Sequence, residues 1–383
     1  MTVSPFNRNP EMSLGQKVLQ INWGLVLLVC ALAGVGCVML YSAANGSMEP
    51  WAFQHGVRFA VALVMMLTVA LFDIRFIFRW TWLFYFGALG LLVTVEVMGT
   101  IGMGAQRWID LYVMQLQPSE VMKVAIVLAL AKYFHGVSEE EIARPIRLIP
   151  AGLLLAAPVG LVLKQPDLGT AVMLVMVAGA IFFAAGVRLW KFALLGGLAA
   201  ASVPVIWQFL HSYQIKRVLT FLDPSRDPLG SGYHITQSKI ALGAGGIFGK
   251  GFLEGTQSHL NFLPEKQTDF IFTMLAEEFG MVGGLGLLGL YTLVLIYGFA
   301  ISLRARNHFG RLVAIGLTVN LFLYVFINIA MVMGLIPVVG VPLPLISYGG
   351  TAMLAVMLSF GLLISVYVHR DIRMPRRGLE DDD

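Results

Sequence analysis

Long apolar runs constrain the fold of this chain more than any other feature. Segments of about 20 apolar residues recur along the whole sequence, and a helix of that length crosses the hydrocarbon core of a bilayer. The composition fits such a chain, since 58% of the 383 residues are hydrophobic and only 13% are charged. Mean hydropathy is +0.80, which lies outside the range of soluble globular proteins. The sequence therefore predicts a protein built from membrane-spanning helices.

Polar and basic residues interrupt these runs and divide the chain into ten predicted membrane-spanning helices. We expect these helices at residues 21–44, 54–74, 78–100, 119–136, 148–164, 169–187, 192–210, 281–303, 312–334 and 351–368. The predicted fold class is an all-α polytopic membrane protein. Its membrane domain covers 21–368 and contains one long loop, 211–269, between the seventh and eighth helices. Residues 1–20 and 369–383 form the terminal segments.

The placement of basic residues predicts the orientation of the helices. Of the 26 Lys and Arg residues, 16 lie in the terminal segments and in the connections on the same side. Because short cytoplasmic loops are enriched in Lys and Arg, we expect both termini in the cytoplasm and the 211–269 loop outside it. The net charge of +4 then reports topology, so membrane lipids are expected as partners and nucleic acid is not. Cys30 and Cys37 lie on the first helix and predict packing rather than a disulfide.

A first polar cluster, GAQRWIDLYVMQLQPSEVMK at 104–123, lies on the predicted outer side. Pro118 indicates a helix start, and Glu120 and Lys123 follow one turn apart, so an ion pair is expected. Charges at this depth are costly unless each one has a partner. The pair is either a structural salt bridge or the wall of a polar cavity, and the sequence leaves both open.

A second cluster is KQPDLGT, at 164–170. Pro166 is expected to end the fifth helix, and Asp167 to cap the sixth. Capping alone explains Asp167, but Lys164 on the same face also favours a charged network around this carboxylate.

Two further segments on the outer side are irregular. The segment 334–351, GLIPVVGVPLPLISYGGT, is rich in proline and glycine and cannot continue a helix, so we expect it to line a cavity. The long loop contains an apolar stretch, 235–242, and the glycine run GAGGIFGKG at 243–251. Backbone amides of such a run can cradle an anion, although it matches no nucleotide-binding fingerprint.

Together these motifs resemble the SEDS family (shape, elongation, division and sporulation) from about residue 20 to 370. The resemblance rests on QRWIDL, QPSE, KQPDLGT, KRVLTFLDPSRDPLGSGYHITQSKIALGAGGIFGKG, GTQSHLNFLPEKQTDFIFTMLAEEFG and VVGVPLPLISYGG. The stretch GTQSHLNFLPE is closer to elongation-type than to division-type members. One departure is visible, because members often carry His where this chain has Gln267.

The resemblance implies a peptidoglycan glycosyltransferase in the bacterial cytoplasmic (inner) membrane. Such an enzyme polymerises lipid II into glycan strands by inverting transfer of a glycan from an undecaprenyl pyrophosphate donor. Asp269 matches the essential acidic residue of the family and is the expected general base. A class B penicillin-binding protein and the elongation machinery are implied as partners.

The leaving pyrophosphate needs positive charge, and several side chains on the predicted outer side are candidates for binding it or the rest of the substrate. The predicted substrate-binding residues are Arg107, Glu120, Lys123, Lys164, Asp167, Arg217, Lys239, Lys266 and Ser347. No dedicated metal site and no bound cofactor is predicted, although Mg²⁺ or Mn²⁺ at the pyrophosphate is compatible with this chemistry.

Three alternatives remain at this level. A lipid II flippase would also place polar residues at membrane depth, but it needs them along a path across the bilayer, whereas here they gather on one side. A scaffold that recruits cell-wall enzymes would not require the charged residues to converge. A septal, division-type paralogue would perform the same chemistry at a different site in the cell.

Overall fold

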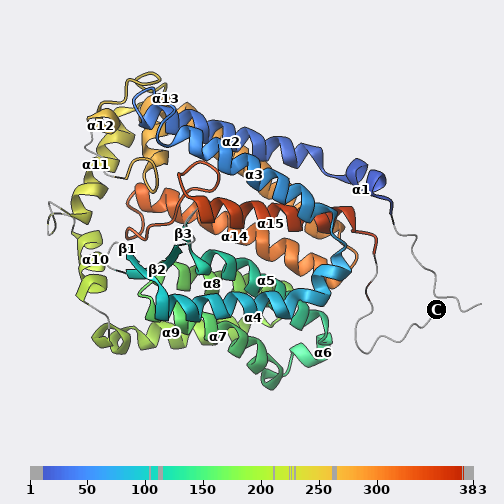
Figure 1. The fold of residues 1–383 in the computed structure, drawn as a ribbon. Helices are drawn as coiled ribbons and strands as arrows, with labels where there is room; N and C mark the ends of the chain where they lie inside the picture. Colours follow the sequence, from blue (N-terminus) through green and yellow to red (C-terminus); the bar gives the residue numbers. More distant parts are fainter. Residues whose placement is uncertain are drawn as a thin grey trace, which may run out of the picture.

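The computed structural model describes residues 12–102, 105–110, 115–209, 212–223, 225, 227, 230–260, 265–372 and 374. Long helices lie side by side along one direction and form an elongated bundle (Figure 1). At one end lie α10 (Ser212–Leu222), α11 (Ser231–Ala244), α12 (Thr256–His259) and a small sheet, and we call this the loop end. At the opposite end lie α1 (Leu14–Gln20) and residues 369–372, and we call this the terminal end.

Each predicted span falls on a helix of the bundle. These helices are α2 (Trp23–Ala43), α3 (Ala52–Leu71), α4 (Ile74–Met98), α5 (Pro118–His135), α7 (Ile149–Lys164), α8 (Leu168–Ala184), α9 (Leu189–Phe209), α13 (Ile271–Arg304), α14 (His308–Val332) and α15 (Gly350–Val368). In the described part of the chain, seven segments are long and apolar enough to cross a membrane, namely α2, α3, α4, 145–164, α13, α14 and α15. The protein is therefore an integral membrane protein.

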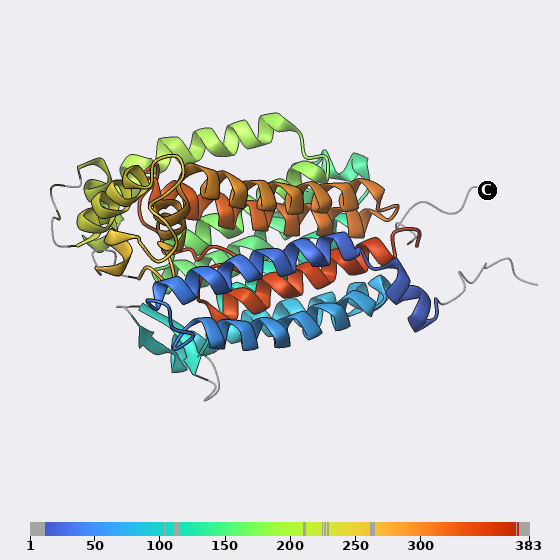
Figure 2. The same cartoon turned by 90° about the horizontal axis from the view of Figure 1, so that it is seen from above.

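The centre of the bundle consists of α5, α14 and α15, whose side chains are mostly buried. α14 contacts α5, α8, α13 and α15, and α15 packs along α3. Figure 2 shows α9 at the periphery, away from this centre. Small residues allow the central helices to approach closely: a Cβ on Gly361 of α15 would lie 2.8 Å from the Met66 carbonyl of α3.

The all-α prediction is wrong in one place, because a small antiparallel sheet follows α4. Its strands β1 (Thr100–Gly102), β2 (Ala105–Asp110) and β3 (Gln115–Leu116) pair in the order β1-β2-β3. Gly99 ends the preceding helix, and the β-branched and aromatic residues that follow, such as Ile101 and Trp108, favour strands. The sheet satisfies the backbone hydrogen bonds of this polar segment and carries Arg107 at the loop end.

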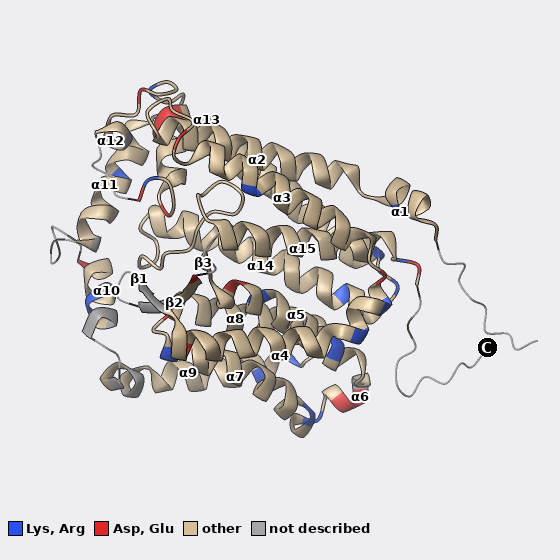
Figure 3. Cartoon of the chain, in the orientation of Figure 1, with Lys and Arg blue, Asp and Glu red and all other residues tan. Residues whose placement is uncertain are grey.

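Short helices complete the terminal end. α6 (Glu139–Ile142) and the 3₁₀ helix η1 (Pro145–Leu148) connect α5 to α7. Figure 3 shows many Lys and Arg residues at this end, while the charged residues inside the bundle gather toward the loop end.

Candidate active site

Asp269 lies just before α13 in a turn whose backbone carbonyls accept hydrogen bonds from side chains of other segments. The Asn328 side-chain amide donates to the Asp269 carbonyl (3.0 Å) and to the Val341 carbonyl (2.7 Å). On the other side of the turn, the Ser347 hydroxyl donates to the Thr268 carbonyl at 2.6 Å. These contacts hold the turn between α14 and the irregular segment 334–349, so the position of Asp269 depends on both.

The Asp269 carboxylate faces the irregular segment at Gly340. Gly340 has φ +74°, and a Cβ placed there would lie 3.4 Å from Asp269 Oδ2. The preceding residue, Val339, covers Gly169 in the first turn of α8, where an added Cβ would lie 2.0 Å from Val339 Cγ1. Val339 and Gly340 thus connect the Asp269 turn with the start of α8, which Asp167 caps. At Gly169, a side chain larger than that of glycine would not fit unless Val339 moved.

Asp167 is the N-cap of α8, as predicted, and it also faces a cation. Its carboxylate accepts hydrogen bonds from the Thr170 backbone amide (3.1 Å) and the Thr170 hydroxyl (3.0 Å). Arg107 approaches from the sheet, with 3.8 Å between Arg107 Nη1 and Asp167 Oδ2. The same guanidinium donates to the carbonyls of Gln165 (3.2 Å) and Pro166 (2.5 Å). Arg107 therefore joins the sheet to the α7–α8 connection.

Glu120 and Lys123 form the predicted ion pair, with 2.7 Å between Lys123 Nζ and Glu120 Oε1. Both side chains are buried. Tyr324 of α14 completes the group, because its hydroxyl donates to the other carboxylate oxygen of Glu120 and its ring lies 4.1 Å from Lys123 Nζ. Each buried charge thus has two partners, as the cost of burial requires.

Lys164 does not take part in the predicted charged network around Asp167. Its ammonium pairs with Glu96 of α4 at 3.0 Å, and its side chain is exposed. The expected partner, Asp167, instead faces Arg107 and the first turn of α8. The reason is helix geometry, since α7 ends at Lys164 and the chain turns at Pro166 before α8 begins.

The remaining predicted cations are spread over the loop end. Lys266 is buried beside the Asp269 turn, and burial lowers the pKa of its ammonium. Lys239 of α11 lies against Gly334, where an added Cβ would lie 2.8 Å from Lys239 Nζ. Arg217 lies on α10, and its side chain is outside the described residues.

The glycine run at 243–251, whose amides could in principle cradle an anion, packs against α13. The backbone amides of Lys250 and Gly251 donate to the carbonyls of Glu277 (3.0 Å) and Glu278 (3.1 Å). The Glu277 side chain pairs with Lys250 at 2.9 Å, and the Glu278 side chain lies 3.1 Å from the His259 ring. Both carboxylates therefore fasten the long loop to α13.

The sequence reasoning did not single out two side chains near the Asp269 turn. The first is Arg58 of α3, which lies 4.7 Å from the ring of Tyr348; the Tyr348 amide in turn donates to the Gln267 carbonyl at 2.8 Å. The second is His234 of α11, whose ring centroid lies 6.2 Å from that of Phe270. Burial lowers the pKa of the His234 imidazole, while the Glu265 and Asp227 carboxylates act in the opposite direction. Arg58 could have been identified from the sequence, because it is a cation within the predicted apolar helix 54–74.

Comparison with known proteins identifies the family to which this arrangement belongs. The FtsW/RodA/SpoVE family of cell cycle proteins matches residues 23–372. This chain belongs to that family. Peptidoglycan glycosyltransferase MrdB of Escherichia coli strain K12 is 42% identical over 366 residues, which cover 94% of this chain and 97% of the relative.

Solved structures have the same fold. One of them is described as showing structural coordination of polymerization and crosslinking by a peptidoglycan synthase complex. It matches with a TM-score of 0.80 and 35% identity, covering 92% of this chain and 98% of the matched chain. The crystal structure of the Thermus thermophilus rod shape determining protein RodA matches with a TM-score of 0.70 and 30% identity, covering 92% of this chain and 98% of that chain. The RodA-like helical fold follows from these similarities.

Proposed function

We propose that this chain is a peptidoglycan glycosyltransferase that polymerises lipid II into glycan strands during cell elongation. The observation that carries the proposal is the 42% identity to MrdB over nearly the whole of both chains. The geometry supports it, because Asp269 is held at the loop end by α14 and the 334–349 segment. Buried charged groups lie on the neighbouring helices α5 and α8.

Asp269 acts as the general base in this proposal. The 4-hydroxyl of the acceptor GlcNAc attacks the anomeric carbon of the donor, and the C–O bond to the undecaprenyl pyrophosphate breaks with inversion. A neutral sugar hydroxyl is a weak nucleophile, so a carboxylate within hydrogen-bond reach takes its proton as the bond forms. One carboxylate suffices, because the pyrophosphate leaves as an anion and needs charge stabilisation more than protonation.

Cations at the loop end supply that stabilisation. Arg107, Lys123, Lys239 and Lys266 are the candidates from the sequence, and Arg58 joins them from the structure. Mg²⁺ or Mn²⁺, if bound with the substrate, would add positive charge at the leaving pyrophosphate beside these side chains. Within the described residues there is no group of three or more His, Cys, Asp or Glu side chains that could hold a metal ion.

The distribution of buried charge disfavours the flippase alternative. The buried charged residues of the described part are Glu120, Lys123, Asp167, Lys191, Lys266, Glu277 and Glu278. All except Lys191 lie toward the loop end, and Glu96 pairs with Lys164 at the same end. A transport path would need polar groups across the whole bilayer. The division-type alternative is less favoured, because the 42% identity to MrdB exceeds the 38% identity to a relative named as a probable FtsW.

Ten membrane-spanning helices, with both termini cytoplasmic and the 211–269 loop outside, are part of the proposal. The shorter apolar helices α8 and α9, together with α5, are the three proposed spans beyond the seven apolar segments. A class B penicillin-binding protein is the proposed partner, which the similarity to a peptidoglycan synthase complex supports. The proposed location is the bacterial inner membrane.

Polymerisation of lipid II by the purified protein tests this function. The chain is purified in detergent with its penicillin-binding partner, and glycan products are separated by gel electrophoresis. Asp269→Asn preserves the size of the side chain and leaves the backbone bond to Asn328 in place. Because general-base assistance contributes on the order of 10²–10⁴-fold, the rate is expected to fall by at least that amount. Glu254→Gln, at an exposed acid of the same loop, is the matched control.

Two outcomes would contradict different parts of the proposal. Polymerisation by Asp269→Asn near the wild-type rate would remove the base assignment and leave Asp269 as a structural residue. Failure of the wild-type complex to polymerise would remove the enzymatic function itself. Repeating the assay with a chelator tests the proposed cation, for which a loss of activity that Mg²⁺ or Mn²⁺ restores is expected.

A further inference from the structure

A small cavity at the terminal end is separate from the proposed active site. It has a volume of about 130 Å³ and lies where the start of α2, the end of α13 and the end of α15 meet. All three helices are among the segments long and apolar enough to cross a membrane. The cavity is therefore placed at the boundary between the apolar bundle and the polar terminal segments.

One wall of the cavity is apolar. Ile296, Ala300 and Ile301 of α13 form it; Ile296 and Ala300, four residues apart, lie on one face of the helix, and the buried Ile301 borders that face. Ile296 is 57% exposed, so this wall opens toward the surroundings of the bundle. Ile296 lies eight residues before the end of α13, or about 12 Å at 1.5 Å per residue, so the wall extends inward from the boundary.

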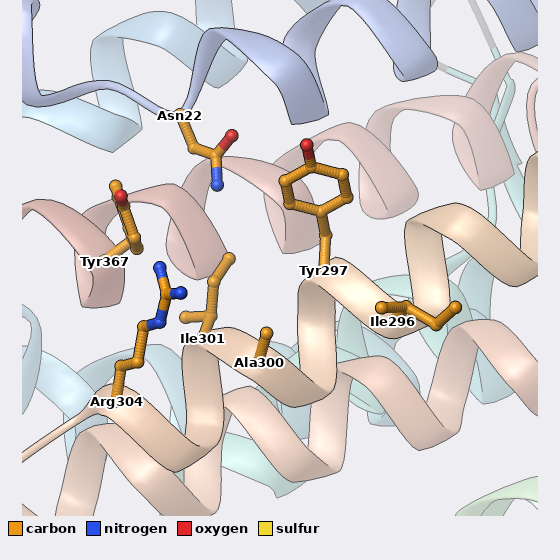
Figure 4. A pocket seen from close by; sticks show the side chains of 7 residues that line it. All are labelled: Asn22, Ile296, Tyr297, Ala300, Ile301, Arg304 and Tyr367. Carbon is orange, nitrogen blue, oxygen red and sulfur yellow. The ribbon is translucent and has the colours of Figure 1, made fainter.

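The opposite part of the cavity carries hydrogen-bond donors. Figure 4 shows the Arg304 guanidinium directed into the space between Tyr367 and Asn22, with Tyr297 on the far side. Asn22 uses its carbonyl oxygen to cap α2 through the Leu25 amide (3.2 Å), and its NH₂ group points toward the cavity. The guanidinium and the amide thus face one space that the two tyrosine side chains border, while the Tyr297 hydroxyl is directed toward α2 at Gly24.

The cavity has positive charge with no matching carboxylate. None of its lining side chains is acidic, and no residue in the described part of the chain pairs with Arg304. The nearby Asp371 carboxylate is engaged by Arg306 (3.3 Å) and Arg370 (3.8 Å). Other basic groups at this end bind backbone carbonyls, as Lys17 does at Leu71 (3.0 Å) and Lys191 at Ala143 (2.9 Å). Among the described residues, the exposed Arg304 side chain therefore has no acidic partner and is accessible to a ligand.

We propose that this cavity binds an acidic phospholipid, with the phosphate on the Arg304 guanidinium and the Asn22 amide and an acyl chain along the wall formed by Ile296 and Ala300. Guanidinium groups hold phosphate oxygens through paired hydrogen bonds, and Tyr and Arg favour the membrane interface. Amphipathic tyrosines suit the junction of headgroup and chain. A zwitterionic lipid is disfavoured because none of the described lining residues has a carboxylate for its ammonium group. This site is independent of the proposed transferase function.

Native mass spectrometry of the purified full chain tests the proposal by titration with phosphatidylglycerol and with phosphatidylcholine. Wild type is expected to bind one phosphatidylglycerol more tightly than phosphatidylcholine. Arg304→Gln should weaken this binding about fivefold, the factor that one basic residue contributes at an anionic surface. Arg188→Gln is the matched control, because Arg188 is an exposed arginine at the same end and outside the cavity.

A second variant tests the apolar wall without changing charge. Ala300→Leu fills the space proposed for the acyl chain and should also weaken phosphatidylglycerol binding, while thermal unfolding remains close to wild type. Equal loss in Arg188→Gln and Arg304→Gln would overturn the site in favour of general surface attraction. Equal affinity for the two lipids would overturn the acidic preference. Displacement of the lipid by inorganic phosphate would overturn the lipid assignment. Unchanged phosphatidylglycerol binding in Ala300→Leu would also overturn it and would favour a partner helix as the occupant of the cavity.

Discussion

Lys123 allows the two interpretations of the buried ion pair to be separated. Lys123→Met keeps the length of the side chain but leaves the Glu120 carboxylate buried without its cation. Removing one partner of such a pair costs about 3–5 kcal/mol, so a clearly lower midpoint of thermal unfolding is expected. Lys164→Met removes an exposed partner of Glu96 and should cost only about 0–1 kcal/mol.

A double variant then distinguishes structure from catalysis. Glu120→Gln together with Lys123→Met removes both charges, so much of the lost stability should return. If the pair only supports the fold, polymerisation should return with it. If Lys123 also stabilises the leaving pyrophosphate, the stable double variant should stay inactive. A Lys123→Met protein as stable as wild type would contradict the structural part of this interpretation.

Single residues also show what the sequence could and could not predict about the site. Asp167 as a helix cap and the Glu120–Lys123 pair follow from local rules, because both partners lie within one helical turn. Partners that are distant in the sequence were not predictable in the same way. Tyr324 reaches Glu120 across 204 positions, and Lys164 reaches Glu96 instead of Asp167. Such contacts depend on how helices are arranged, which no local pattern specifies.

Among the secondary-structure elements, the contact between the glycine run and α13 makes a sharp prediction. Gly249 has φ +81°, and a Cβ placed there would lie 2.0 Å from the Glu278 carbonyl oxygen. Gly249→Ala should therefore destabilise the loop end by about 1–3 kcal/mol, from backbone strain and steric overlap. Faster hydrogen exchange in α11 and α12 would report this loss.

The same glycine-rich segment contains its own control. Gly243 lies on α11, and an added Cβ there meets no atom within 4 Å. Because alanine favours a helix over glycine by about 1 kcal/mol, Gly243→Ala should be neutral or slightly stabilising. Equal exchange rates in the two variants would contradict the role assigned to the Gly249 contact.

Secondary-structure elements could be predicted from the sequence where a continuous apolar run defines them. Each predicted apolar range falls on a helix, because in lipid a helix satisfies its own backbone. The strands at Thr100–Gly102 and Ala105–Asp110 were missed, since they are short and polar and lack a clear alternating pattern. The short helices of the long loop, such as Thr256–His259, were missed for a similar reason.

The whole molecule is asymmetric in charge, and this asymmetry predicts how it sits in the membrane. Figure 3 shows basic residues gathered at the terminal end, whereas Asp269 and the buried ion pairs lie toward the loop end. Cytoplasmic ends of membrane proteins retain Lys and Arg, so the terminal end should face the cytoplasm and the loop end the opposite side. With this predicted orientation, the proposed active site would face the outer side of the cytoplasmic membrane.

Cysteine labelling on intact cells measures this orientation directly. Cys30 and Cys37 are first replaced by alanine, and a single cysteine is then placed at Glu254, an exposed position of the loop end, or at Arg144, an exposed position of the terminal end. With any outer membrane permeabilised, an impermeant maleimide should label Glu254→Cys at once and Arg144→Cys only after the cytoplasmic membrane is broken. The reverse pattern would invert the topology and, with it, the side from which lipid II reaches Asp269. α13 is kinked at Gly280, and its part after the kink, 281–304, measures about 36 Å at 1.5 Å per residue, which is enough to place the two ends of the bundle on opposite sides of a bilayer. Labelling of both positions on intact cells would contradict this arrangement.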